Sequence, residues 1–399
     1  MKAMGALSDL LILDLSRVLA GPYGTMVLSD FGARVIKVEQ PGQGDETRAW
    51  GPPFTEAGQS AYFLCANRNK ESITLNLKHP EGQAIVRALA SKADVLVENF
   101  KVGTLAAFGL GYDDLQRENP GLIYCAITGY GQYGPYADRP GYDTVIQAQG
   151  GLMSITGPFE GEPFKVGVAV VDITAGLYAA TSILAALHHR QRSGEGQLID
   201  IALYDVQLSW LANVASAYLV SGRAPQRQGN AHATIVPYQP LRAADGAVMV
   251  AVGNDGQFAR FCAALSQPAW ASDVRFATNP ARVAHRELLI PLIEALTEVL
   301  PTHALITRLL DAEVPCGPVN DIPTALSDPQ ATARNMLQYA HHPLTGEVPL
   351  VGPAPKLSAT PPQIRSAPPQ HGEQTALILR ELLGYDDERI ASLKALGAI

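Results

Sequence analysis

Asp172 is the residue whose type and position most clearly suggest chemistry. An apolar run ending at Val171 precedes this carboxylate, and small residues after it begin a helical pattern. A carboxylate in apolar surroundings is costly unless it is hydrogen-bonded or paired, whereas a helix N-terminus offers unpaired N–H groups and a positive partial charge. Asp172 is therefore either a helix N-cap or a functional carboxylate, and the other motifs must decide between the two.

A glycine-rich motif, Gly129 to Gly134, has the GxGxxG spacing of dinucleotide-binding sites and follows an expected strand. Such a site needs a helix to begin at the motif and to face the pyrophosphate. Here the loop residues Pro135, Asp138 and Pro140 follow instead. The motif therefore indicates an active-site loop and argues against a nicotinamide site. The sequence also has neither a GxSxG elbow nor a P-loop signature.

The cysteines and histidines do not predict a metal site. The four cysteines, at positions 65, 125, 262 and 316, are scattered without a CxxC pair, so we expect at least three of them to be buried free thiols. The pairs His188-His189 and His341-His342 are adjacent in sequence, and adjacent side chains point about 100° apart on a helix or to opposite faces of a strand. Neither pair would readily share a zinc ion.

The composition limits the kinds of partner. The chain has 399 residues, 47% of them hydrophobic and 17% charged, which is enough for a large core and two domains. The net charge of −8 and the lack of a Lys/Arg-rich run argue against nucleic acid. No apolar stretch approaches the roughly 18 residues of a membrane span, and the N-terminus lacks a signal-peptide pattern. We therefore expect a cytoplasmic protein with no membrane partner.

Strand and helix patterns alternate in the N-terminal half. Residues 10–15 and 33–39 have the pattern of buried strands, and between them a break at Gly21-Pro22 precedes a helix at 23–31. This βαβ start predicts an α/β fold with a Rossmann-like, doubly wound parallel sheet. The pattern continues with strands at 72–77, 95–98, 122–128 and 198–203, and with helices at 80–90, 174–192 and 204–219. The helix at 174–192 is apolar on nearly every side and should be buried.

The C-terminal half has a different character. We expect four parts: a large α/β domain at 1–220, a polar linker at 221–230, a small α+β domain at 231–325, and a Pro-rich tail at 326–399 that returns to the large domain. The small domain should contain a hairpin over 238–252 with its turn at Asp245-Gly246, followed by amphipathic helices.

Segments along nearly the whole chain, in the same order, resemble the family III CoA-transferases, also called the CaiB/BaiF family. No single segment is decisive, but the set is highly specific. The segments that carry the resemblance are Leu13–Pro22, Phe31–Glu39, Gly44–Arg48, Asn67–Lys70, Ser72–Lys78, Ala93–Phe100, Gly129–Gly131, Tyr142-Asp143, the Asp172 segment, Gly194–Gln197 and Val314–Val319.

The resemblance implies that Asp172 is the catalytic nucleophile. Its carboxylate would attack the thioester of an acyl-CoA, releasing CoA thiolate and leaving an aspartyl mixed anhydride. The thiolate would then attack the aspartyl carbonyl to give an aspartyl-CoA thioester, and an acceptor acid would reverse these steps. One thioester is made for each one broken, so coenzyme A is a substrate and no tightly bound cofactor is needed. Water must be excluded from the anhydride.

The resemblance also implies which residues bind CoA. The matching positions are Val18, Leu19, Leu75, Lys78, Asn99, Phe100, Lys101, Arg139, Tyr142 and Asp143. Val18 and Leu19 are expected beside the adenine, while lysine and arginine side chains would meet the phosphates.

Two positions depart from the family pattern, since members often have Arg where this chain has Ala107 and a basic residue near Gln40. Lys101, Arg68 or Lys70 could compensate, although each could equally be a solvated surface charge.

The small domain carries the residues expected to bind the acid. The resemblance brings the segment 229–239 to the active site, with His232, Tyr238 and Gln239 as substrate-binding candidates. His232 could donate a hydrogen bond to a second carboxylate, or it could be structural. The segment is most similar to that of succinyl-CoA:glutarate and related dicarboxylate transferases, and it lacks the multi-glycine loop of the formyl-CoA enzyme, which argues against oxalate.

The expected function is therefore transfer of CoA from succinyl-CoA to a C4 to C6 dicarboxylate such as glutarate, by an interlocked homodimer. One alternative is an α-methylacyl-CoA racemase, whose histidine falls where this chain has Tyr142, a side chain without a base near neutral pH. The other is a non-catalytic CoA-binding protein, which the intact Asp172 segment disfavours.

Overall fold

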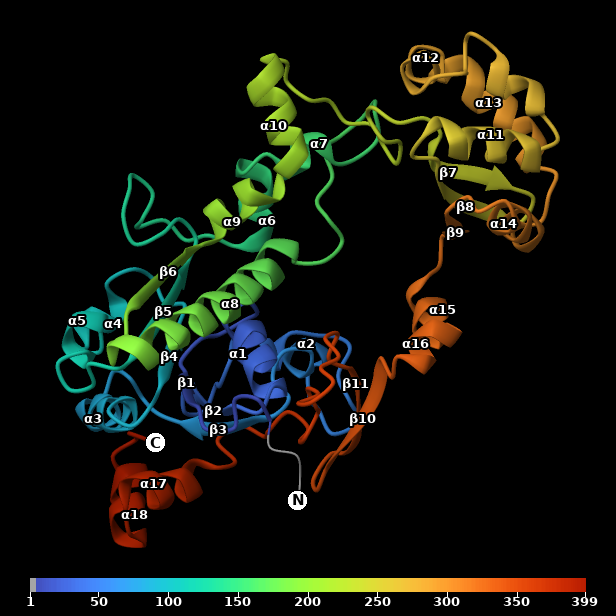
Figure 1. The fold of residues 1–399 in the computed structure, drawn as a ribbon. Helices are drawn as coiled ribbons and strands as arrows, with labels where there is room; N and C mark the ends of the chain where they lie inside the picture. The colour runs from blue at the N-terminus through green and yellow to red at the C-terminus, as the bar shows by residue number, and fades with distance from the viewer. Residues whose placement is uncertain (1–4) are drawn as a thin grey trace. The chain divides into compact units, whose positions relative to one another are not determined.

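The computed structural model describes residues 5–399, which form two compact units (Figure 1). Of the described residues, the first unit contains 5–152, 166–215 and 329–399. The second contains residues 153–165 and 216–328. The first unit is therefore built from three separate stretches of sequence, and the C-terminal stretch belongs to it.

The first unit is built on a six-stranded parallel sheet in the order β3-β2-β1-β4-β5-β6. The strands are β1 (Leu11–Asp14), β2 (Arg34–Glu39), β3 (Lys70–Thr74), β4 (Val95–Glu98), β5 (Ile123–Thr128) and β6 (Leu198–Ala202). The central strands β4 and β5 are almost wholly apolar and fully buried, which is typical of a parallel sheet that is covered on both faces. The predicted Rossmann-like parallel sheet is confirmed.

Helices cover both faces of this sheet (Figure 1). Helices α1 (Ala20–Asp30) and α8 (Val170–Ser193) pack together on one face. The other face, which includes Leu13, Ile36 and Leu96, forms a core with apolar residues of five helices. These are α3 (Pro80–Ala90), α4 (Thr104–Ala107), α5 (Tyr112–Leu115), α17 (Thr375–Leu383) and α18 (Asp387–Ala395).

Two glycines let α1 and α8 cross with their backbones in contact. A Cβ on Gly24 would lie 2.7 Å from the carbonyl oxygen of Gly176, and a Cβ on Gly176 would lie 2.6 Å from that of Ala20. Any larger residue would force the helices apart, because these neighbours are backbone atoms that cannot give way. Since Gly176 follows Asp172 by one helical turn, the crossing fixes the start of α8 beside the start of α1.

Several local predictions are wrong. The expected break at Gly21-Pro22 lies inside α1, because a proline in the first helical turn needs no hydrogen-bond partner for its nitrogen. The helix expected at 204–219 is divided into α9 (Leu203–Trp210) and α10 (Ala212–Ser221), with a positive φ of 35° at Ala212. The hairpin of β10 (Leu337–His342) and β11 (Gly346–Val351) was not predicted.

Helix α8 differs from its prediction in two ways. It was expected to be buried, but Leu177, Tyr178 and Leu184 are exposed. Its 24 residues also meet the length and hydropathy criteria for a membrane span, so the expectation that no stretch does so is wrong. Half of that apolar window is buried within the structure, and the core helix of a globular protein meets the same criteria.

The second unit has a three-stranded antiparallel sheet of β7 (Tyr238–Ala243), β8 (Gly246–Ala251) and β9 (Cys316–Pro318). The predicted hairpin with its turn at Asp245-Gly246 is confirmed. Val248, Val250, Phe258 and Phe261 belong to its buried core. The main helices are α11 (Asp255–Ala264), α12 (Asn279–Ala284), α13 (Arg286–Thr297) and α14 (Thr302–Asp311).

The C-terminal stretch is held to the first unit by specific hydrogen bonds. The backbone N–H of Arg365 donates to Asn69 Oδ1 over 2.5 Å, and its guanidinium donates to the carbonyl oxygen of Ser29 over 2.7 Å. Near the chain end, the N–H of Asn76 donates to the carbonyl oxygen of Ala398 over 2.8 Å. These bonds place the tail along α1 and the edge strand β3.

Candidate active site

The loops that follow the strands line two cavities at the carboxyl edge of the parallel sheet. Ligands of open α/β sheets bind at this edge, beside the point where the strand order reverses, which here lies between β1 and β4. The cavity that contains the nucleophile candidate, called the Asp172 cavity below, has a volume of about 450 Å³. Its lining consists of residues 17–20, Glu46, 99–102, 127–129, 137–142, Asp172 and Leu203.

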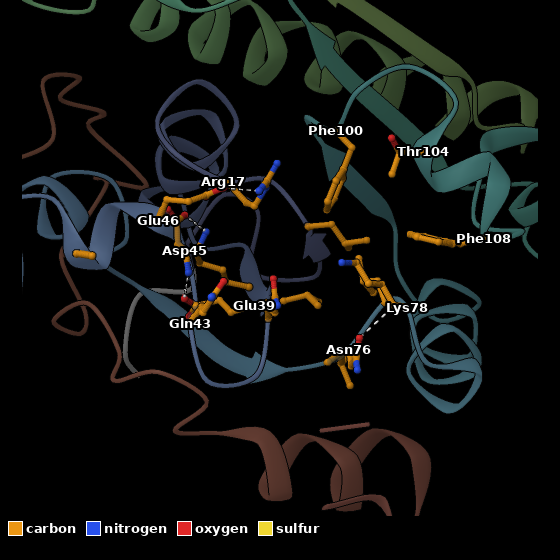
Figure 2. Close-up of a pocket in the computed structure, with 18 of the residues that line it drawn as sticks. Arg17, Glu39, Gln43, Asp45, Glu46, Asn76, Lys78, Phe100, Thr104 and Phe108 are labelled. Atoms are coloured by element: carbon orange, nitrogen blue, oxygen red, sulfur yellow. Dashed lines mark hydrogen bonds and ion pairs between the residues drawn. The ribbon is translucent and has the colours of Figure 1, made fainter. Parts of the chain in front are cut away.

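The second cavity, called the Lys78 cavity below, has a volume of about 750 Å³ (Figure 2). Its lining consists of Leu15, Arg17, 37–40, 43–46, Ala49, Trp50, 75–78, Phe100, Thr104 and Phe108. Arg17, Glu46 and Phe100 line both cavities. The Arg17 guanidinium pairs with Glu46 and lies 4.9 Å from the centre of the Phe100 ring, so these three side chains form a wall that the cavities share.

Asp172 is the third residue of α8 and is half-buried. Its carboxylate accepts no hydrogen bond from residues 5–399, and the N-cap position belongs to Ala169, whose side chain cannot cap. Asp143 supplies the missing cap from the first residue of α6 (Asp143–Gln149): its Oδ2 accepts the N–H of Val171 over 2.8 Å and that of Asp172 over 3.3 Å. The N-cap interpretation of Asp172 is therefore wrong, and its carboxylate is left free in the cavity.

The surroundings of Asp172 disfavour its charge. Burial, and after it the negative charge of Asp143, raise the pKa of Asp172 to about 7. The negative charge of Asp172 in turn affects Tyr62: burial, and after it Asp172, raise the pKa of Tyr62 to about 12. A carboxyl group with a pKa near neutrality and no hydrogen bond to its oxygens is a better nucleophile than an ordinary carboxylate, and about half of it is ionised at pH 7.

Most of the predicted CoA-binding residues lie in the two cavities. Leu75 and Lys78 line the Lys78 cavity. The others line the Asp172 cavity, and Phe100 lines both: Val18, Leu19, Asn99, Phe100, Lys101, Arg139 and Tyr142. Val18 and Leu19, expected beside the adenine, share their cavity with Asp172.

Asp143 is the exception among the predicted CoA-binding residues, since it lines neither cavity. It is buried, and the amide of Gln147 donates to its Oδ1 over 2.5 Å while its Oδ2 caps α8. Its position is that of a residue that holds the backbone of Asp172 instead of one that contacts a ligand.

Arg68 and Lys70 cannot replace the basic residues missing at Ala107 and Gln40. Arg68 is buried and paired with Asp30 over 2.6 Å. Lys70 is buried between Asp14, at 3.0 Å, and the carbonyl oxygen of Pro22. Neither side chain lines a cavity, so this part of the prediction is wrong, whereas Lys101 does line the Asp172 cavity.

Three residues near the cavities were not chosen from the sequence. Arg17 follows the end of β1 by three positions, and this place at the carboxyl end of a strand is a signal that could have identified it. Trp50 lines the Lys78 cavity, and its ring packs edge-on against Tyr62 at 5.0 Å. Nothing in the local sequence marks Trp50 or Tyr62, because their neighbourhood depends on the path of the loop between β2 and β3.

The predicted acid-binding residues lie in the second unit. The N–H of His232 donates to the carbonyl oxygen of Tyr238 over 2.9 Å, and the two rings lie 5.3 Å apart. Nδ1 of His232 accepts the N–H of Thr234 over 3.2 Å, so the ring is held on one side. Gln239 follows Tyr238 in β7. A role for these three residues in binding the acid stays a prediction.

Metal chemistry was not expected, and residues 5–399 contain no cluster of three or more His, Cys, Asp or Glu side chains arranged to hold a metal ion. The four cysteines are free thiols, but only Cys125 and Cys262 are buried, so the expectation of at least three buried thiols is wrong.

Comparison with known proteins identifies the family. The sequence model of CoA-transferase family III matches residues 7–375. The succinate–glutarate CoA-transferase of Agrobacterium fabrum is 48% identical over 94% of this chain and 95% of its own length. The human succinyl-CoA:glutarate CoA-transferase is 43% identical over 97% of this chain and 88% of its own length.

The fold leads to the same family. The crystal structure of a CAIB/BAIF family protein from Brucella suis superposes with a TM-score of 0.86 and 45% identity, covering 95% of this chain and 100% of the other. With a family match over almost its full length, two cavities at the switch point of the sheet and a free carboxylate in one of them, the chain belongs to CoA-transferase family III.

Proposed function

We propose that this CoA-transferase moves CoA from succinyl-CoA to a short dicarboxylate such as glutarate, with Asp172 as the nucleophile. The observation that carries the proposal is the free, half-buried Asp172 carboxylate whose pKa is raised to about 7. The names of the most similar relatives support succinyl-CoA and glutarate as the substrate pair.

The shared wall suggests how an acyl-CoA is placed. We propose that the nucleotide end occupies the larger Lys78 cavity, where Lys78 and Arg17 would meet phosphate charge. The pantetheine arm would pass Arg17 and Phe100, which line both cavities, and bring the thioester to Asp172. Val18 and Leu19 would then contact the acyl end, and not the adenine as expected from the sequence.

The first half of the reaction uses the free carboxylate. A carboxylate oxygen of Asp172 attacks the succinyl carbonyl, the C–S bond breaks, and CoA leaves as the thiolate. The product is a succinyl–aspartyl anhydride. The thiolate then attacks the aspartyl carbonyl of this anhydride, which releases succinate and leaves an aspartyl-CoA thioester.

The second half repeats these steps with the acceptor. The glutarate carboxylate attacks the aspartyl thioester to give a glutaryl–aspartyl anhydride and CoA thiolate. Attack of the thiolate on the glutaryl carbonyl gives glutaryl-CoA and restores the Asp172 carboxylate. During each covalent stage Asp172 is uncharged, so the negative charge of Asp143, which disfavours ionised Asp172, favours the acylated states.

A substrate screen tests this proposal. Succinyl-CoA is mixed with a panel of mono- and dicarboxylates, and new thioesters are identified by mass spectrometry. Glutarate and its C4 to C6 relatives should give the highest kcat/KM, and Asp172→Asn should abolish transfer. The matched control is Asp114→Asn, since Asp114 is also the third residue of a helix but lines neither cavity. Preference for monocarboxylates would contradict the proposed acceptor.

The racemase alternative requires a base beside the α-carbon, which is a histidine in those enzymes. Of residues 5–399, no histidine lines either cavity, and Tyr142 stands at the matching position with 64% of its surface exposed. Incubation of the substrate in deuterium oxide without an acceptor acid separates the two functions, because only a racemase would exchange the α-hydrogen.

We also propose that the protein acts as an interlocked homodimer in the cytoplasm, as the family resemblance suggests. Exposed apolar side chains support a protein partner: α10 has no buried residue, and Leu219 and Val220 are 79% and 90% exposed. An apolar surface of this kind is typical of an interface. Light scattering should give twice the chain mass, and Leu219→Glu should weaken the dimer if α10 lies in its interface.

A further inference from the structure

Six charged side chains gather near the carboxyl ends of β1 and β2, and three of them, Lys37, Glu39 and Asp45, also line the Lys78 cavity. They come from the first three strands and from the loop after β2, and they form the pairs Asp14–Lys70, Asp45–Lys37 and Glu39–Arg48. The first two pairs are completely buried, with nitrogen-to-oxygen distances of 3.0 Å and 2.8 Å. We call these six residues the strand-end network.

Stability alone is a weak explanation for this network. Removing two charges from water costs several kcal/mol per ion, and well-packed apolar residues often stabilise a core as well as a buried pair does. In some proteins a buried pair instead fixes the geometry of the groups that it bonds. The role of the network can therefore be inferred from the backbone groups that it and the neighbouring side chains bind.

Those backbone groups belong to Ser16, Arg17 and Val18, the link between β1 and α1. The N–H of Ser16 donates to Asp14 Oδ1 over 2.9 Å, and its carbonyl oxygen accepts Lys37 Nζ over 2.9 Å. Asn99 holds both sides of Arg17, with its Oδ1 accepting the N–H over 2.8 Å and its Nδ2 donating to the carbonyl over 2.7 Å.

The N–H of Val18 completes this set, since it points between the two oxygens of Asp45 at 3.3 Å from each. Asp45 is itself fixed by Lys37 Nζ at 2.8 Å and by the hydroxyl of Thr47 at 2.7 Å. The pKa of Asp45 is lowered to about 2, so it is ionised at neutral pH despite its burial.

Val18 needs to be held. Its φ is +68°, in the left-handed region, which is a genuine outlier for a β-branched residue and costs on the order of 1–3 kcal/mol. Such strain persists only where the surroundings enforce it. Its effect is to turn the chain so that Val18 and Leu19 face the Asp172 cavity, while Arg17 reaches the wall between the cavities.

We propose that Asp45 is a positioning residue for CoA transfer: fixed by its ion pair with Lys37, it holds Val18 in its strained conformation so that the β1–α1 link presents its residues to the thioester beside Asp172. Asp45 acts through the backbone of Val18 and takes no part in bond making. The proposal rests on the proposed function, since it concerns the placement of the acyl-CoA that Asp172 attacks.

The test uses the different cost of positive φ in glycine and alanine. Val18→Gly and Val18→Ala both remove the side chain, but only glycine adopts a φ of +68° without strain. Each is combined with Asp45→Asn, which removes the charge and keeps the shape. Asp45→Asn alone should lower kcat/KM about tenfold, because the strained conformation of Val18 then loses the charge that holds it in place.

In the Val18→Gly background, Asp45→Asn should lower kcat/KM less than about twofold, because nothing strained remains to be held. In the Val18→Ala background the loss should stay near tenfold. Equal losses in both backgrounds would overturn the proposal, as would a loss that matches the fraction of unfolded protein in a thermal melt. If Asp45→Asn does not fold, Asp45→Asn with Lys37→Met, which leaves no unpaired lysine, replaces it in both backgrounds.

Wild-type turnover separates this proposal from the proposed function. If the wild type transfers CoA between no pair of acids tested, the proposed substrates fail. The same variants are then compared by their affinity for succinyl-CoA, and the glycine background should again be the insensitive one. An identical change in affinity in the glycine and alanine backgrounds would contradict the role of Asp45.

Discussion

Two groups of carboxylates, one fully buried and one half-buried, lie at the same edge of the sheet and have opposite electrostatics. In the strand-end network, Asp45 lies 2.8 Å from Lys37 and its pKa is lowered to about 2. At the start of α8, Asp172 has a negative neighbour, Asp143, and its pKa is raised to about 7. Burial opposes charge in both places, so the difference lies in the partners: a cation and several donors in one, and a second carboxylate in the other.

The comparison separates a carboxylate that holds structure from one that reacts. Asp45 has its oxygens occupied by Lys37, Thr47 and Val18, and it is ionised at any physiological pH. Asp172 has free oxygens because Asp143 has taken over the capping of α8. Each of the following changes acts on one side of this contrast.

The largest effect is expected for Asp172→Asn. Loss of the nucleophile should lower kcat at least about a thousandfold, while binding of CoA and the fold are kept. Steady-state kinetics with succinyl-CoA and glutarate, together with circular dichroism, measure both. Retention of more than a tenth of the activity would contradict the assignment of Asp172.

Breaking a buried pair should have the largest effect on stability. Lys70→Met leaves Asp14 charged and without its cation, and should lower the free energy of unfolding by about 3–5 kcal/mol. The control is Arg380→Gln, which breaks the exposed pair with Asp387 and should cost less than about 1 kcal/mol. The free energies of unfolding are measured by urea titration. Equal losses for the two variants would contradict the prediction that breaking a buried pair destabilises the fold more than breaking an exposed one.

The pH dependence of transfer should follow Asp172. The kcat/KM for succinyl-CoA should rise with pH and have a midpoint near 7, because only the ionised carboxyl attacks. Asp143→Asn removes the neighbouring negative charge and should move this midpoint to lower pH, even if the rate at high pH also falls. An unchanged midpoint would mean that Asp143 does not act on the charge of Asp172.

The smallest effect is on the pH dependence of stability. Asp172 keeps its proton up to about pH 7 in the folded chain but loses it near 3.8 when unfolded, so its contribution to stability falls as pH rises between these values. Asp172→Asn should therefore raise Tm relative to wild type by more at pH 8 than at pH 4. Asp45 has a lowered pKa, so Asp45→Asn should lower Tm at pH 8 and lower it less as pH falls through 3.8 to about 2.

The sequence was sufficient for the sheet because β1, β4 and β5 are short apolar runs, and β2 alternates apolar and charged residues. The strand at 95–98 and the helix at 80–90 were predicted with their observed bounds. The hairpin β10–β11 was missed because its alternating residues lie in a Pro-rich tail without a strong periodic pattern. Pro22 was misjudged because a proline in a first helical turn looks the same, in sequence, as one that ends a helix.

For the site, the order of the motifs predicted that Asp172 and most residues lining its cavity act together. It did not predict which charged side chains pair with each other. Arg68 and Lys70 look like surface cations in the sequence, and only the fold shows that they are paired with Asp30 and Asp14 inside the core. Asp143 adjoins Tyr142, and only the packing of α6 against α8 shows that it caps a helix. Pairing between distant residues depends on tertiary structure, which local patterns do not encode.

The most direct test of covalent catalysis is to trap the acylated enzyme. The protein is incubated with succinyl-CoA and no acceptor, treated with hydroxylamine, digested, and its peptides are analysed by mass spectrometry. Reaction through an anhydride or thioester at Asp172 should leave a hydroxamate on that residue, and Asp172→Asn should leave none. A hydroxamate on another residue, or none at all in an enzyme that turns over, would contradict the central claim.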